Sequence, residues 1–135
     1  MRVKLAIAIA GVGVYLAAAN VPLAAHHAFA AEFDSNKAIT VQGAVFKVEW
    51  TNPHIWVYVD AKDAAGKVER WQCEGGSPNT LARQGWSRDT LKPGDQVVIE
   101  GFRAKNGSNT CNSRTVKTAN GKTLFAGSSL GQENP

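Results

Sequence analysis

Strict alternation of apolar and other residues predicts a β-strand between His54 and Ala61. Successive side chains of a strand point to opposite faces, so Ile55, Val57 and Val59 share one face. The opposite face carries polar and aromatic side chains, namely His54, Trp56, Tyr58 and Asp60. We therefore expect the aliphatic face to lie in the core and the aromatic face to remain at least partly exposed.

Turn residues divide the rest of the chain into further short strands. The segments with the composition of strands are 39–50, 67–74, 96–104, 115–118 and 123–125. Asp63–Gly66, Asn106-Gly107 and Asn120-Gly121 have the composition of hairpin turns. Pro53 cannot continue a central strand, so we expect a turn between the first two strands.

One short helix is predicted between the third and fourth strands. Ser77 is a suitable N-cap, and Pro78 suits the first helical position because its missing N–H needs no partner there. Residues 80–84 are compatible with a helix, and Gly85 suits the C′ position that ends it. We expect Trp86 to fold back onto this helix.

This order of elements predicts a mainly β protein that forms a small OB-like antiparallel barrel. An OB fold is a five-stranded Greek-key barrel, expected here over residues 39–126 with the helix between strands three and four. An SH3-like barrel and an open antiparallel sheet are the alternatives. A lead-in of residues 26–38 precedes the barrel, and residues 127–135 are expected to form a flexible tail.

The first 25 residues have the pattern of a secretion signal. Arg2 and Lys4 precede an uncharged apolar stretch, 5–19, and Leu23-Ala24-Ala25 leads into the expected cleavage bond. An uncleaved membrane anchor is the alternative, but this stretch is shorter than the roughly 20 residues of a spanning helix. We expect cleavage after Ala25, export to the periplasm or the medium, and no stable membrane insertion afterwards.

The charge of the chain argues against nucleic acid as a partner. The sequence has 15 basic and 11 acidic residues and a net charge of +4. Removal of Arg2 and Lys4 with the signal lowers that charge by two. The expected mature chain has no run of Lys and Arg, so a polyanionic ligand or an anionic membrane gains no support.

Cys73 and Cys111 are the two cysteines of the sequence. Disulfides form in oxidising compartments, and a bridge here would close a loop of about 38 residues and contribute roughly 3–4 kcal/mol. Two separate half-buried thiols are the alternative. The spacing is unlike CxxC, which excludes a thioredoxin-type or zinc-ribbon interpretation.

Three motifs of the chain resemble those of a widespread family of uncharacterised secreted bacterial proteins. They are HHAFAAEFD at 26–34, VEWTNPHIW at 48–56 and LKPGD at 91–95. The resemblance covers essentially the whole expected mature chain. It implies a small periplasmic protein with a domain of unknown function, and it implies no activity.

The three histidines suggest a metal site. Cleavage after Ala25 would leave His26 with an α-amine and an imidazole that chelate one ion together, as in the histidine brace of copper enzymes. His27 and His54 would add imidazoles, a donor set that suits Cu(II), Ni(II) or Zn(II). Cleavage after Ala24 would place His27 third, an arrangement that binds square-planar Cu(II) or Ni(II). In the alternative interpretation, the first two histidines are only polar residues at a chain end and His54 caps a turn.

A second candidate site is a ligand or partner face made of aromatic and polar side chains. Its members are Trp50, Asn52, His54, Trp56 and Tyr58. OB barrels bind ligands over this part of the sheet, and exposed aromatic patches mark contact surfaces. The alternative is that Phe29 and Phe33 of the lead-in cover these rings.

The sequence contains no nucleophile elbow, phosphate-binding loop or dinucleotide fingerprint. We therefore expect a binding module for a small ligand or a periplasmic protein, and not an enzyme. One alternative is a copper-binding protein centred on His26, His27 and His54, including a copper-dependent redox role. Another is a structural envelope protein that docks a second component.

Overall fold

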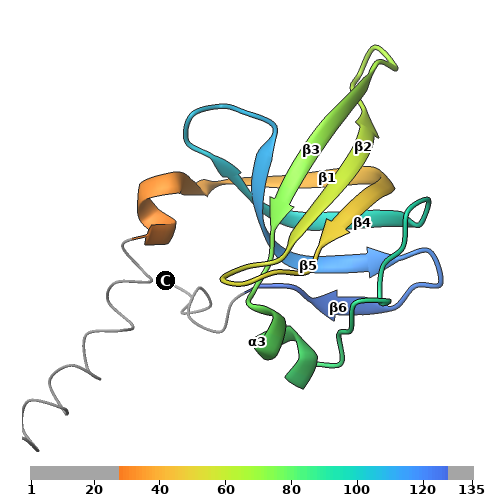
Figure 1. The fold of residues 1–135 in the computed structure, drawn as a ribbon. Helices are drawn as coiled ribbons and strands as arrows, with labels where there is room; N and C mark the ends of the chain where they lie inside the picture. Colours follow the sequence, from red (N-terminus) through yellow and green to blue (C-terminus); the bar gives the residue numbers. More distant parts are fainter. Residues whose placement is uncertain (1–27, 128–135) are drawn as a thin grey trace, which may run out of the picture.

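A computed structural model describes residues 28–127, which form a mainly β structure (Figure 1). A short helix spans residues 28–32, and a second helix, α3 (Pro78–Arg83), lies between the third and fourth strands. The strands are β1 (Phe33–Glu49), β2 (Trp56–Lys62), β3 (Val68–Glu74), β4 (Gln96–Ala104), β5 (Thr110–Thr118) and β6 (Thr123–Phe125). The expected signal segment, its cleavage bond, His26 and His27 lie outside the described residues.

Five of the strands close into a ring. The sheet order is β3-β2-β1-β4-β5-β6, and a further pairing joins β3 to β5. This pairing is parallel, whereas the other neighbours are antiparallel. The ring closure excludes an open sheet and confirms the prediction of a mainly β, OB-like fold with a helix between strands three and four.

The core fills the inside of the ring, as the alternation in β2 predicts. Ile55 and Val59 are completely buried, and Val57 is nearly so. They pack with inward residues of the other strands, among them Val41, Val45, Val97, Ile99 and Val116. Trp56 and Tyr58, on the other face of β2, are half-buried, which confirms the expected orientation of the strand.

The helix α3 covers the end of the ring that lies lowest in Figure 1. The Ser77 side chain accepts a hydrogen bond from the Thr80 backbone N–H at 3.2 Å, which makes Ser77 the N-cap. Gly85 has a φ of 93°, the left-handed conformation that ends a helix with little strain. Trp86 folds back as expected: it is buried, and its indole N–H donates to the Phe125 carbonyl oxygen at 2.8 Å.

Long-range pairing extends two strands beyond their predicted bounds. β1 begins at Phe33 and not at Ile39, because Phe33 is buried and pairs with Ala104 of β4. β5 begins at Thr110 and not at Thr115, because its first residues pair with β3. Part of the expected lead-in is therefore a strand of the ring.

Gly43 lies where β1 passes from one neighbouring strand to the other. It pairs with Ala61 of β2 and with Val97 of β4. A Cβ atom on Gly43 would overlap the Asp60 backbone carbonyl oxygen. The absence of a side chain therefore lets β1 approach β2 closely at this point.

Within residues 28–127, none of the helices has both the length and the apolar character required to cross a bilayer.

Candidate functional site

Trp56 lies in an open cleft at the junction of β2, β3 and β5. The cleft has a volume of roughly 600 Å³ and lies between the helix 28–32 and the β4–β5 loop, residues 105–109. Besides Trp56, its lining includes the polar and charged side chains of Glu32, Gln72, Lys105, Asn106, Ser108 and Thr110. We refer to this hollow as the Trp56 cleft.

Hydrogen bonds fix the polar wall of the Trp56 cleft. The Gln72 side-chain amide donates to Thr110 Oγ1 at 3.0 Å, and the Ser108 hydroxyl donates to the same oxygen at 2.9 Å. Asn106 Oδ1 accepts from the Ser108 backbone N–H at 3.0 Å. These side chains are therefore held in place before any ligand arrives.

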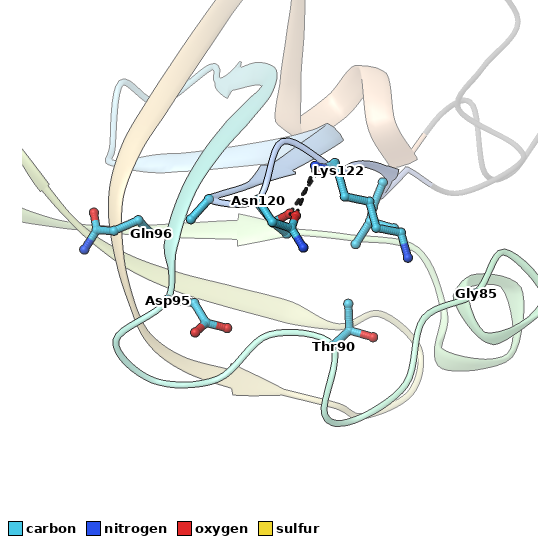
Figure 2. A pocket seen from close by; sticks show the side chains of 9 residues that line it. Gly85, Thr90, Asp95, Gln96, Asn120 and Lys122 are labelled. Carbon is cyan, nitrogen blue, oxygen red and sulfur yellow. Dashed lines mark hydrogen bonds between the residues drawn. The ribbon is translucent and has the colours of Figure 1, made fainter.

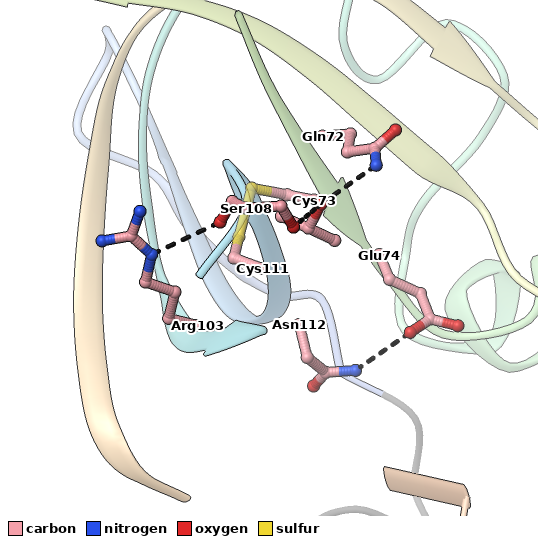
Figure 3. The surroundings of a disulfide bond; sticks show 8 residues. Gln72, Cys73, Glu74, Arg103, Ser108, Cys111 and Asn112 are labelled. Atoms are coloured by element: carbon pink, nitrogen blue, oxygen red, sulfur yellow. Dashed lines mark hydrogen bonds between the residues drawn. A yellow bond between two sulfur atoms is a disulfide. The ribbon is translucent and has the colours of Figure 1, made fainter. Parts of the chain in front are cut away.

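The β4–β5 loop is anchored from behind the cleft (Figure 3). The Arg103 guanidinium donates to the backbone carbonyl oxygens of Gly107 and Ser108, at 2.8 and 3.3 Å. The disulfide between Cys73 and Cys111 joins β3 to β5 one residue beyond Gln72 and Thr110. The sequence left a disulfide and two free thiols open, and the structure has the disulfide, with both cysteines completely buried.

The opposite wall is the helix 28–32. The Lys105 backbone N–H donates to the Glu32 carbonyl oxygen at 2.9 Å, and the Lys105 ammonium group donates to the Ala30 carbonyl oxygen. Phe29 stacks on Phe33 with ring centroids 5.7 Å apart and meets Phe102 edge to face at 5.9 Å. The lead-in therefore packs beside the cleft through Phe33, and Trp56 stays half-buried.

His54 lies beside the cleft and faces an acidic side chain. Its Nδ1 contacts Glu74 Oε1, and Glu74 is the cross-strand neighbour of Trp56. The Asn112 side-chain amide donates to the other Glu74 oxygen at 3.5 Å, as Figure 3 shows. A carboxylate accepts hydrogen bonds, so Nδ1 is the donor of this pair and Nε2 is the ring nitrogen left for another partner.

Tyr58 belongs to a charged cluster farther along the same face. Its hydroxyl donates to Glu49 Oε2 at 3.2 Å, and Lys47 pairs with Glu49 at 2.5 Å and lies 4.4 Å from the centroid of the Tyr58 ring. The hydrogen bond from Lys47 lowers the pKa of Glu49, and burial raises the pKa of Tyr58. The Tyr58 hydroxyl and both Glu49 oxygens are therefore already engaged within the cluster, whereas the exposed Lys47 ammonium group has further N–H groups available.

A second ion pair, between Arg70 and Asp60, lies beyond Tyr58 on the same face. Arg70 binds Asp60 through two hydrogen bonds of 2.8 and 3.0 Å, and its guanidinium stacks over the Phe46 ring at 3.5 Å. The hydrogen bond from Arg70 lowers the pKa of Asp60. Arg70 thus covers part of the exposed Phe46 side chain.

The structure separates the residues that the sequence grouped as one face. Trp56 lines the cleft and His54 lies beside it, whereas Tyr58 belongs to the cluster with Glu49. Trp50 packs against the core, and Asn52 is exposed in the turn, where the Asn52–Pro53 peptide bond is cis.

Sequence reasoning missed Gln72 and Glu74. Both lie on the outer face of β3 and pair with Tyr58 and Trp56 of β2, respectively. Alternation in the third strand, aligned with the second across the predicted hairpin, would have placed them on the same face as the aromatic residues. Thr110 and Ser108 give no such signal, because only the β3–β5 pairing brings them to this place.

Another hollow, of roughly 420 Å³, lies near the Asn120 turn (Figure 2). Its polar side chains already support turns of the backbone. Asn120 Oδ1 accepts from the Lys122 backbone N–H at 3.1 Å, and Asp95 Oδ2 accepts from the Lys92 backbone N–H at 2.8 Å. We therefore assign these residues to turn formation and not to a ligand site.

The described residues supply only part of the expected metal site. In residues 28–127, no three His, Cys, Asp or Glu side chains come close enough to hold an ion. His54 and Glu74 form a pair, and the other expected ligands, His26 and His27, precede the described residues.

Comparison with known proteins gives one result. A family model, described as a family of unknown function (DUF6152), matches residues 13–113. Neither the curated proteins nor the solved structures give a match to the chain.

Proposed function

Because the chain belongs to DUF6152, a family of unknown function, we propose a function from its own site: an exported binding module whose ligand occupies the Trp56 cleft. The observation that carries this proposal is a half-buried indole beside fixed, uncharged hydrogen-bonding side chains. Ligand sites combine apolar surface with a few well-placed polar groups in this way. In OB folds the outer face of strands two and three and the loop between strands four and five form the ligand site, and the cleft occupies the equivalent region.

Export is part of the proposal and rests on the signal-like residues 1–25. The Cys73–Cys111 disulfide adds weak support, because such bonds persist in oxidising compartments. Mass spectrometry of the secreted protein would test it. A chain that begins at His26 is the expected result, and a chain that retains residues 1–25 would contradict it.

Nuclear magnetic resonance tests the cleft directly. The ¹⁵N-labelled exported protein would be mixed in turn with neutral oligosaccharides, nucleotides, short peptides and fatty acids. We expect at least one class to shift the Trp56 indole N–H, the Gln72 side-chain amide and the amides of residues 105–109. Trp56→Ala should abolish these shifts. Tyr58→Ala, on the same face but outside the cleft, should preserve them.

Two results of this experiment would contradict the proposal. One is that no class gives saturable shifts at the cleft. The other is that saturable shifts gather at a distant surface, such as the Asn120 turn.

Copper binding is a second candidate function, and the His54–Glu74 pair favours it. Histidines that bind a metal through one ring nitrogen usually donate the other N–H to a carboxylate, and His54 Nδ1 faces Glu74 in this way. The amine of His26 and the imidazole of His27 would supply the other ligands. These donors suit Cu(II).

Calorimetric titration of the exported protein with Cu(II) tests this candidate. His54→Ala should abolish one-to-one binding, and Glu74→Gln should weaken it roughly 10–100-fold. Glu69→Gln, at an acidic residue of the same strand, is the control. Unchanged affinity in His54→Ala would remove His54 from the site, and unchanged affinity after blocking the α-amine would exclude the brace.

A further inference from the structure

We infer that the ligand of the Trp56 cleft is a neutral saccharide. This inference rests on the proposed function, since it names the class of ligand for the same cleft. Three properties of the wall carry it: its charge balance, its hydrogen-bonding groups and its aromatic ring.

The cleft has one positive and one negative group, so its net charge is zero, and the positive group already has a hydrogen-bond partner. Lys105 and Glu32 are the two charged residues that line it. The Lys105 ammonium group already donates to the Ala30 carbonyl oxygen. Binding of nucleic acid or another polyanion depends on several Lys and Arg contacts to the charged groups, so this wall disfavours an anionic ligand.

The polar groups of the wall combine donors and acceptors. Thr110 Oγ1 accepts hydrogen bonds from Gln72 and from Ser108, so both of its lone pairs are used and its own hydrogen is available to donate. Gln72 donates one N–H of its side-chain amide to Thr110, which leaves the second N–H as a further donor and the carbonyl oxygen as an acceptor. A donor and an acceptor therefore lie side by side. A sugar hydroxyl can accept from the first or donate to the second, and neighbouring hydroxyls can use both.

Trp56 supplies the surface that such a ligand also needs. A pyranose ring has polar hydroxyl groups at its edge and a less polar face of C–H groups. That face packs on an indole ring, whose π surface carries partial negative charge. A fatty acid would use Trp56 but leave the Gln72 carbonyl oxygen and the Thr110 hydroxyl hydrogen unpaired beneath it, and unpaired polar groups that a ligand buries oppose binding. The volume of roughly 600 Å³ lies within the range of small-molecule sites.

Isothermal calorimetry of the exported protein provides the test. The probes are tetramers of β-1,4-linked glucose, β-1,4-linked N-acetylglucosamine and β-1,3-linked glucose, with a thymidine tetranucleotide as the anionic comparison. We expect at least one saccharide to bind with an affinity that barely changes between low and high salt. Trp56→Ala and Gln72→Ala should each weaken this binding at least about tenfold.

Gln96→Ala, a matched change at an exposed glutamine outside the cleft, should leave the affinity unchanged. Amide spectra of each variant would verify that it is folded. If none of the saccharides binds, or if binding is insensitive to both cleft variants, the saccharide assignment is wrong. Peptides or nucleotides that shift the cleft resonances in the previous experiment would then preserve the proposed function, whereas no shift with any class would refute both.

Discussion

At the scale of a single residue, Ser113 is a polar side chain whose burial in the core is unfavourable for the stability of the fold. It is 1% exposed, and its hydroxyl has no hydrogen-bond partner in the part of the chain that the structure describes. A buried hydroxyl without a partner costs about 1–3 kcal/mol. Ser113→Ala should therefore raise the free energy of unfolding by about 1 kcal/mol, measured by urea denaturation. Ser35→Ala, at an exposed position, is the control, and a clear loss of stability in Ser113→Ala would mean that the hydroxyl has a partner.

Arg70 affects stability through the charge of Asp60. Replacing it in Arg70→Met removes the hydrogen bonds that lower the pKa of Asp60, so that pKa should rise toward its ordinary value. A carboxylate with a lowered pKa stabilises the fold above its ordinary pKa of 3.8, and the effect disappears as the pH falls through the lower folded value. The wild type should therefore lose its pH-dependent advantage in free energy of unfolding over Arg70→Met as the pH falls through the folded pKa of Asp60.

A carboxyl titration by nuclear magnetic resonance measures the Asp60 pKa in both proteins, and urea unfolding at several pH values measures the stability. Lys67→Met, which removes an exposed charge that does not contribute to the lowered pKa of Asp60, serves as the control. An Asp60 pKa that is the same in wild type and Arg70→Met would show that the two residues do not interact in solution.

At the scale of the elements, β1 depends on one small residue, Gly43, for its close approach to β2. It follows β4 along its first part and β2 along its last part, and Gly43 pairs with both. Gly43→Ala would force a methyl group against the Asp60 carbonyl oxygen, so we expect a loss of roughly 1–3 kcal/mol or more. Thr40→Ala, at an exposed position of the same strand, should change stability by less than about 0.5 kcal/mol. Thermal unfolding compares the two, and equal midpoints would show that β1 can move away from β2.

The sequence predicted the elements that local patterns determine. Alternation identified the buried face of β2, and turn residues gave the exact bounds of β4 and β6. The start of β5 was missed because Thr110–Arg114 is polar, with Ser113 at an inward position that usually holds an apolar residue. Only the partner strand, far away in sequence, makes this segment a strand.

The same limit applies to the candidate site. Local patterns identified Trp56 and His54, whereas Gln72 and Thr110 meet through a pairing that links distant parts of the chain. The cysteines contained the missing information: a bridge from Cys73 to Cys111 implies that the residues before them, Gln72 and Thr110, are also neighbours. The sequence left that bridge undecided, so it could not be used to build the cleft.

At the scale of the whole molecule, the Cys73–Cys111 disulfide has two effects. It links β3 to β5, the two strands that close the ring, and it supports the neighbouring Trp56 cleft. Its loop of 38 residues predicts a contribution of roughly 3–4 kcal/mol to stability. We expect the double variant Cys73→Ala/Cys111→Ala to lose about this much in urea unfolding. Hydrogen exchange should accelerate first at Gln72–Glu74 and Thr110–Asn112, the residues that pair across β3 and β5.

A reductant separates the bond itself from the packing of the cysteine side chains. It should lower the urea midpoint of the wild type and leave that of the double variant unchanged. If the wild type keeps its midpoint after complete reduction, the packing around the sulfurs and not the covalent link holds β3 against β5.

The division of β1 between two partners also sets an order of events for the newly synthesised chain. Its last part meets β2 through a short turn, whereas its first part must wait for β4, which follows both β3 and α3. Contacts between distant segments slow the search for the native state, and proteins dominated by them fold in milliseconds to seconds. We expect β1, β2 and β3 to assemble as an early nucleus and β4 and β5 to join late. Val57→Ala should therefore slow refolding in stopped-flow experiments, and Val116→Ala should mainly accelerate unfolding.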